Sequence, residues 1–194
     1  MVNFKDGDQQ PVTVETTVLQ ADELAGGTTI EHEEAGQPAH ALEGALTAVA
    51  LGFAVFPCNP LNKRPLINDW RNHATRDQQT IMDWWTANPD MMVGAVTGSP
   101  SGYFVIDIDV KDGIDAETKL EVLRDLFGDL GVVFMVSTPS GGLHLYCKMP
   151  PNEEVRNSTS VIAHGVDIRG TGGYVIFPGS IRHDGKKYRF VKEA

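Results

Sequence analysis

One stretch, residues 103–110 (YFVIDIDV), constrains the fold of this chain most strongly. It is rich in β-branched and aromatic residues, which predicts a buried strand. Because side chains alternate between the faces of a strand, Asp107 and Asp109 share one face while Ile106 and Ile108 share the other. Two carboxylates held side by side repel each other, and Mg²⁺ and Mn²⁺ prefer oxygen ligands of this kind. The stretch therefore predicts a metal site on one face of a sheet.

Two later stretches repeat the alternation. Residues 142–148 place His144 on the same face as Tyr146 and Lys148, and residues 165–170 place Asp167 beside Arg169. If these strands share a sheet with residues 103–110, three aspartates, a histidine and an arginine lie on one surface. That surface would offer a third carboxylate to a metal and two donors to phosphate oxygens.

Simpler interpretations exist for each piece taken alone. A single Asp-x-Asp can be structural, a single strand histidine is usually a packing residue, and Asp167 could pair with Arg169 or Lys148. The joint pattern favours a site, because burying three unpaired carboxylates without a cation or a basic partner costs several kcal/mol.

Glycine-rich turns flank the later strands, at residues 138–142 (TPSGG) and 170–173 (GTGG). Such turns let backbone amides approach phosphates, although a hairpin also explains each of them. The sequence contains neither a P-loop nor a strand–GxGxxG–helix pattern.

Elsewhere, helices alternate with strands early and strands dominate late, which predicts an α/β (α+β) class with a partly antiparallel sheet. The expected helices span 39–51, 75 or 77 through 86, and 115–127. The expected strands span 53–57, 91–96, 103–110, 132–137, 142–148, 164–169, 173–178 and 187–190.

Charge divides the chain unevenly. Residues 1–36 carry eight acids and one lysine, a net −7, whereas the other 158 residues carry 18 acids and 15 bases, a net −3. We therefore expect a flexible acidic tail over 1–38 and one domain over 39–194. Residues 169–192 hold six bases and one acid, which suits phosphate contacts or a solvated hairpin. With two cysteines, no signal-peptide pattern and no apolar run long enough to span a bilayer, the chain is expected in the cytoplasm.

The ordered motifs resemble those of the bifunctional primase–polymerase (prim-pol) domain of the archaeo-eukaryotic primase superfamily, as in phage and plasmid replication proteins. Flanking residues agree from about position 39 to the C-terminus. The motifs that carry the resemblance are Asp107-Ile-Asp109, Ser140-Gly-Gly-Leu-His144 and Val166-Asp167, with flanks at 50–57, 63–65, 84–85, 96–98 and 165–175.

The resemblance implies a site of specific residues. Asp107, Asp109 and Asp167 would be catalytic and would hold two Mg²⁺ or Mn²⁺ ions. His144 would contact the phosphates of the incoming nucleotide. The other nucleotide-binding residues would be Ser140, Arg169 and either Lys63 or Arg64.

The resemblance also implies a small αβ module joined to a mixed sheet like that of an RNA-recognition motif, with the active site in the cleft between them. The activity would be template-dependent nucleotidyl transfer to a 3′-hydroxyl, as DNA polymerase, primase or both. The partners would be single-stranded template, primer, dNTP or NTP, and a helicase domain or subunit, with no membrane. Zinc is not expected, because two cysteines are too few for the zinc-binding insertion of some relatives. The expected setting is a bacterial, archaeal or phage-infected cell. There are two alternatives: a non-catalytic module that binds nucleotide or nucleic acid and, less favourably, a two-metal nuclease.

Overall fold

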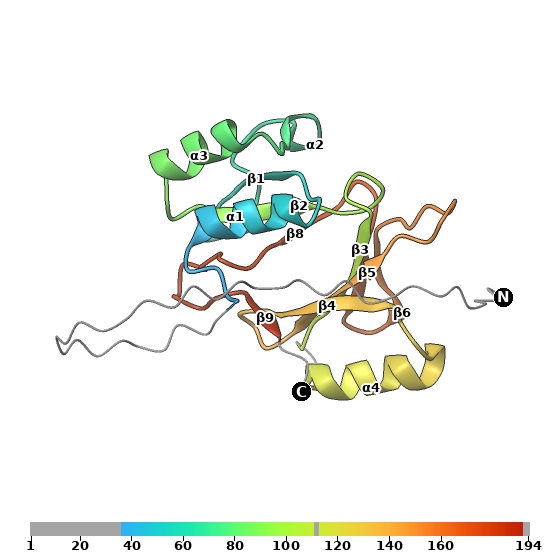
Figure 1. Cartoon of the computed structure of the whole chain (residues 1–194). Coiled ribbons are helices and arrows are strands. Elements are labelled where there is room, and N and C mark those ends of the chain that lie inside the picture. The colour runs from blue at the N-terminus through green and yellow to red at the C-terminus, as the bar shows by residue number, and fades with distance from the viewer. Residues whose placement is uncertain (1–35, 111–112, 192–194) are drawn as a thin grey trace, which may run out of the picture. The chain divides into compact units, whose positions relative to one another are not determined.

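The computed structural model describes residues 36–110 and 113–191 (Figure 1). The helices are α1 (Ala41–Ala50), α2 (Trp70–His73), α3 (Gln78–Ala87) and α4 (Ala116–Phe127). The strands are β1 (Val55–Cys58), β2 (Met92–Val96), β3 (Tyr103–Ile108), β4 (Val132–Ser137), β5 (Leu143–Lys148), β6 (Ser158–Ala163), β7 (Val166–Arg169), β8 (Tyr174–Ile176) and β9 (Arg189–Val191). The mixed helix-and-strand class expected from the sequence is confirmed.

The strands form two sheets. A three-stranded sheet has the order β1-β2-β8, and α1 and α3 pack against it. A six-stranded sheet has the order β6-β7-β3-β5-β4-β9. Within the large sheet β5 lies between β3 and β4, which are joined through α4, so this part is a split β-α-β unit.

Every strand pair in both sheets is antiparallel, whereas the sequence indicated a mixed or only partly antiparallel sheet. The difference arises because β5 is inserted between β3 and β4, so that the two strands joined by the helix never pair directly. Periodicity within each strand does not reveal such an insertion.

Two hydrophobic cores cover the two faces of the large sheet. Val105 and Tyr146 point into the core shared with the small sheet, where Tyr103 stacks on Phe53 at 5.1 Å between ring centroids. The opposite face packs on α4 through Ile106, Ile108, Leu120 and Leu123. Alternation along β3 therefore puts Asp107 on the face that meets the small sheet.

Helix capping agrees closely with the sequence. The Asp77 and Asp115 carboxylates accept hydrogen bonds from the backbone N–H groups of Thr80 and Thr118, both at 2.8 Å. The first helix starts at Ala41, two residues later than expected, because His40 takes the N-cap position. The sequence missed α2 and β6, which are a single turn and a mostly exposed edge strand.

The predicted acidic tail over 1–38 lies almost wholly outside the described residues. The described residues, 36–110 and 113–191, belong to one compact unit. Gln37 already belongs to the described fold, since its amide side chain exchanges two hydrogen bonds with the backbone of Phe190 (2.7 and 2.8 Å). In the part of the chain that the structure describes, no helix has the length and apolar character needed to cross a membrane.

Candidate active site

The three strands that carry the ionisable motifs are neighbours. β3 lies between β5 and β7, and Asp107 is directly opposite His144 on one side and Asp167 on the other. This register confirms the adjacency on which the sequence argument depended. Two carboxylates directly opposite each other in an antiparallel pair are mutually destabilising unless a cation lies near them.

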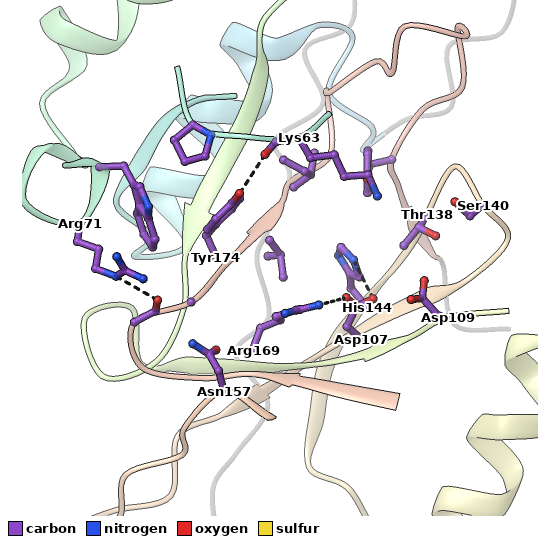
Figure 2. Close-up of a pocket in the computed structure, with 17 residues that line it drawn as sticks. Lys63, Arg71, Asp107, Asp109, Thr138, Ser140, His144, Asn157, Arg169 and Tyr174 are labelled. Atoms are coloured by element: carbon purple, nitrogen blue, oxygen red, sulfur yellow. Dashed lines mark hydrogen bonds and ion pairs between the residues drawn. The ribbon is translucent and has the colours of Figure 1, made fainter. Parts of the chain in front are cut away.

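Arg169 supplies a positive charge to that carboxylate pair. Its Nη2 donates to Oδ2 of Asp167 at 2.8 Å and to Oδ2 of Asp107 at 3.4 Å. His144 Nε2 lies 3.4 Å from the other oxygen, Oδ1, of Asp107. Figure 2 shows the guanidinium extending toward Asp107 from the middle of the site.

Asp107 is held as a carboxylate in a mostly buried position. Its side chain is 18% exposed, so burial acts to raise the pKa of the carboxyl. The hydrogen bond and charge of His144, followed by those of Arg169, outweigh burial and lower the pKa of Asp107 from 3.8 to about 2. A carboxylate that stays ionised at neutral pH therefore faces the cavity.

These residues line a cavity of about 510 Å³ on the face where the two sheets meet. Its charged end includes Asp107, Asp109 and His144, with the hydroxyl groups of Thr138 and Ser140 at its edge. The volume lies within the range of roughly 300–1,000 Å³ that is usual for small-molecule sites.

The other end of the cavity is aromatic and was not anticipated. Trp70 stacks on Phe56 at 4.8 Å, and the guanidinium of Arg71 lies over the Trp70 ring at 4.6 Å. Arg71 Nε also donates to the carbonyl of Gly172 at 3.3 Å, so this exposed side chain is held at two points. Tyr174 completes this end, and its hydroxyl donates to the Lys63 carbonyl at 3.1 Å.

The cavity gathers most of the predicted residues but not all. Of the described residues predicted for the site, Arg64 and Asp167 do not line the cavity. Arg64 is exposed, whereas Lys63 lines the cavity with its ammonium 5.8 Å from the centroid of the Tyr188 ring. Asp167 is engaged by protein donors, since its Oδ1 accepts from the Ser160 N–H at 3.0 Å and its Oδ2 from Arg169.

The donor set fits a hard divalent cation through two carboxylates. Within residues 36–110 and 113–191, no three carboxyl, imidazole or thiol groups converge on one point suited to a metal. Asp107 and Asp167 nevertheless converge on one positively charged atom, Arg169 Nη2, which stands in for a cation. Mg²⁺ is commonly held by one or two carboxylates, with substrate phosphates and water completing its shell.

His144 lines the cavity and also carries a buried ring nitrogen, Nδ1, that has no partner among the described residues. Its ring is 6% exposed, and among the described residues Nδ1 has no hydrogen-bond partner. Tyr188 lies beside it, with the ring centroids 5.9 Å apart. A buried nitrogen without a partner is costly in the free protein, so a rotation of the ring that gave Nδ1 a bound partner would be stabilising.

Several lining residues escaped the sequence argument: Trp70, Arg71, Asn157 and Tyr188. Trp70 and Arg71 lie on the one-turn α2, which has no hydrophobic repeat to mark it. Tyr188 carried a weak signal, because it follows the two lysines of the basic C-terminal stretch.

Comparison with known protein families gives a match that covers most of the chain. Residues 45–194 match the family model described as bifunctional DNA primase/polymerase, N-terminal. No curated protein matches the chain.

Proposed function

Because the chain belongs to the family of bifunctional DNA primase/polymerase N-terminal domains, we propose that it is a template-dependent nucleotidyltransferase that extends a 3′-hydroxyl. The family supports a primase/polymerase-type role in DNA replication. The observation that carries the finer proposal is the Asp107–Asp167 pair on neighbouring strands, in contact with Arg169 and beside a cavity that also holds Asp109 and His144.

Different residues along the cavity would bind the metal ions, the triphosphate and the nucleobase. Asp107, Asp109 and Asp167 would hold two Mg²⁺ or Mn²⁺ ions. When bound, these ions would lower the pKa of the attacking hydroxyl and offset charge on the phosphoryl oxygens. Asp109 lies two residues from Asp107 on the same face and lines the same cavity.

The triphosphate would lie at the charged end. Lys63 and the Ser140 hydroxyl are donors at that end, and a doubly protonated His144 ring would add Nδ1 as a third; together they would orient the α-phosphorus for in-line attack by the primer. Lys63 is the better candidate than Arg64, because only Lys63 lines the cavity.

The nucleobase would lie at the aromatic end. Trp70 already stacks on Phe56 and has the Arg71 guanidinium over its ring, so the guanidinium is the surface on which a base could stack. Guanidinium planes are common stacking partners for bases.

A second cavity of about 610 Å³ continues from the charged end. It shares Thr138 and Ser140 with the first cavity, and its other lining residues include Lys186, Lys187 and Arg189. We assign it to the phosphate backbone of a single-stranded DNA template or primer, since phosphate contacts supply most sequence-independent affinity. A helicase partner and a cytoplasmic setting of phage or plasmid type belong to the same proposal.

A primer-extension assay tests the proposal. The full chain with a primed template, dNTPs and Mn²⁺ should lengthen the primer. The Asp107→Ala/Asp109→Ala variant should be at least about 100-fold slower, the order found when a key electrostatic group is removed from an active site. A matched control, Glu121→Ala/Asp125→Ala, removes two exposed carboxylates from α4 and should keep full activity.

The same assay separates the alternatives. Shortening of labelled DNA without added nucleotides would identify a two-metal nuclease. DNA binding without extension, insensitive to the loss of Asp107 and Asp109, would identify a non-catalytic module.

A further inference from the structure

We infer that Arg169 is a tethered counter-cation: it neutralises Asp107 and Asp167 in the free protein, and it moves to the triphosphate when a divalent ion takes its place. The inference rests on the proposed function and deepens it. It assigns Arg169 a positioning role that couples the two ligands.

The need for a counter-cation follows from the register. Asp107 and Asp167 face each other across adjacent strands, and their side chains are only 18% and 15% exposed. Two such carboxylates in a partly desolvated position repel each other strongly. Arg169 contacts both of them through one nitrogen, Nη2, so a single group relieves the repulsion.

Nη2 contacts the same two carboxylates that would hold the cation. Nη2 lies 2.8 Å from one carboxylate and 3.4 Å from the other, so an ion held by Asp107 and Asp167 would have to displace it. The guanidinium and a divalent ion therefore compete for the same oxygens.

The Arg169 side chain can leave this position without any change in the backbone fold. Its side chain is 34% exposed and lines the cavity, and the only hydrogen bonds described for its guanidinium within residues 36–110 and 113–191 go to these two aspartates. Rotation away from the two carboxylates would keep the guanidinium at the charged end, where the phosphate oxygens of a bound triphosphate would offer bidentate acceptors.

A reciprocal coupling follows. A divalent ion alone must displace Arg169 and leave it without an anionic partner, whereas a triphosphate supplies that partner. Each ligand should therefore strengthen the binding of the other by the same factor, and coupling of this kind typically amounts to about 5–150-fold. The carboxylates would be occupied by metal chiefly when nucleotide is present.

The test measures the affinity of the full chain for Mn²⁺ in the absence of nucleotide. The electron paramagnetic resonance signal of free Mn²⁺ reports how much of the ion is bound. Arg169→Met should bind Mn²⁺ at least about fivefold more tightly than the unmodified protein, the lower end of usual coupling. Arg156→Met is the matched control, because Arg156 is 80% exposed and pairs with Glu154; it should leave Mn²⁺ affinity unchanged. Arg169→Gln, which keeps donors for both carboxylates, should shift affinity in the same direction if the methionine variant folds poorly.

A second readout distinguishes this role from a purely structural ion pair. The affinity of Arg169→Met for dATP with Mn²⁺ should fall, so the two ligands respond in opposite directions. Loss of affinity for both ligands, or unchanged Mn²⁺ affinity in folded variants, would overturn the inference while leaving primer extension by the unmodified protein intact. If Mn²⁺ binding by the unmodified protein does not depend on Asp107, tested with Asp107→Asn, the proposed metal site fails, and the role of Arg169 fails with it.

Discussion

Asp107 shows what one residue's place in the sequence can and cannot specify. Alternation on an apolar strand assigns it to the same face as Asp109, and that follows from the backbone alone. Its contacts with His144 and Arg169 depend on the order of strands in the sheet, which no local pattern encodes. The same holds for Lys63 and Arg64, where loop geometry, including φ +63° at Lys63, decides which side chain lines the cavity.

The lowered pKa of Asp107 predicts a pH-dependent contribution to stability. Since the folded-state pKa is about 2 against an ordinary 3.8, the stabilisation is fully present above about pH 4 and is lost as pH falls through about 2. The free energy of unfolding of the metal-free protein minus that of Asp107→Asn should therefore fall by about 2 kcal/mol between pH 5 and pH 2. Urea titrations in EDTA at several pH values measure this, and a difference independent of pH would contradict it.

Arg71 predicts a nucleobase contribution that can be separated from the phosphates. Arg71→Ala should weaken dATP binding about tenfold, within the range of 1–3 kcal/mol per stacked base, because the stacking plane is lost. Binding of inorganic tripolyphosphate, which has no base, should be unchanged. Calorimetric titration of both ligands measures the contrast.

Two controls sharpen the Arg71 test. Arg71→Lys keeps the charge but loses the planar group, so it should resemble Arg71→Ala for dATP. Arg124→Ala removes an exposed charge from α4, away from the cavity, and should change neither ligand. Equal losses for dATP and tripolyphosphate in Arg71→Ala would show that Arg71 acts on the phosphates instead.

At the scale of elements, periodicity and capping predicted what is regular. The helices α1, α3 and α4 and the central strands β3 and β5 appear within a few residues of their expected positions. The failures are irregular or marginal elements. α2 has four residues, and β6 pairs with β7 across a register shift between Ser158 and Ala163. Such features depend on tertiary contacts, so local propensity does not reveal them.

The glycine-rich turns illustrate a second reason for incomplete prediction. Gly142 has no positive φ; a side chain there would place Cβ 2.2 Å from the Ile108 carbonyl oxygen. Glycine is therefore needed at position 142 because the start of β5 approaches the end of β3 closely. In the 170–173 turn, a Cβ on Gly173 would lie 2.4 Å from the Asn157 side chain. Close packing against the protein therefore explains Gly142 and Gly173. From the sequence alone, this explanation could not be distinguished from a role in letting a ligand approach the backbone.

Gly142→Ala should destabilise the fold and disturb the site together. The added methyl must push β5 away from β3, at a cost of about 1–3 kcal/mol for an overpacked position, and His144 is two residues along the same strand. Chemical denaturation should show the loss, and primer extension should fall by more than the unfolded fraction accounts for. Gly102→Asn is the control, since Gly102 has φ +76° with open space around it, and asparagine tolerates that region. Equal stability of the two variants would contradict the packing argument.

For the molecule as a whole, the distribution of charge matters more than its sum. The net charge of −10 would argue against a nucleic-acid partner, yet −7 of it lies in residues 1–36. The cavity next to the charged end is bordered by three basic residues and by no acidic one among the described lining residues. Asp184, the acid of the same hairpin, is already paired with Arg182.

This arrangement predicts how DNA affinity should respond to salt. Lys186 and Lys187 are exposed and border the second cavity, so Lys186→Ala/Lys187→Ala should weaken binding of single-stranded DNA whatever its sequence. Each lost phosphate contact should reduce the slope of log K against log [salt] by about 0.7, so the double variant should lose about 1.4. Fluorescence anisotropy of a labelled oligonucleotide between low and high salt measures the slope, and dATP affinity should stay within about twofold because the lysines lie outside the first cavity.

Arg124→Ala/Arg156→Ala removes two exposed cations elsewhere and should leave the slope unchanged. If dATP affinity falls instead and the slope for DNA holds, the lysines serve the triphosphate, and the strand leaves the site by another face.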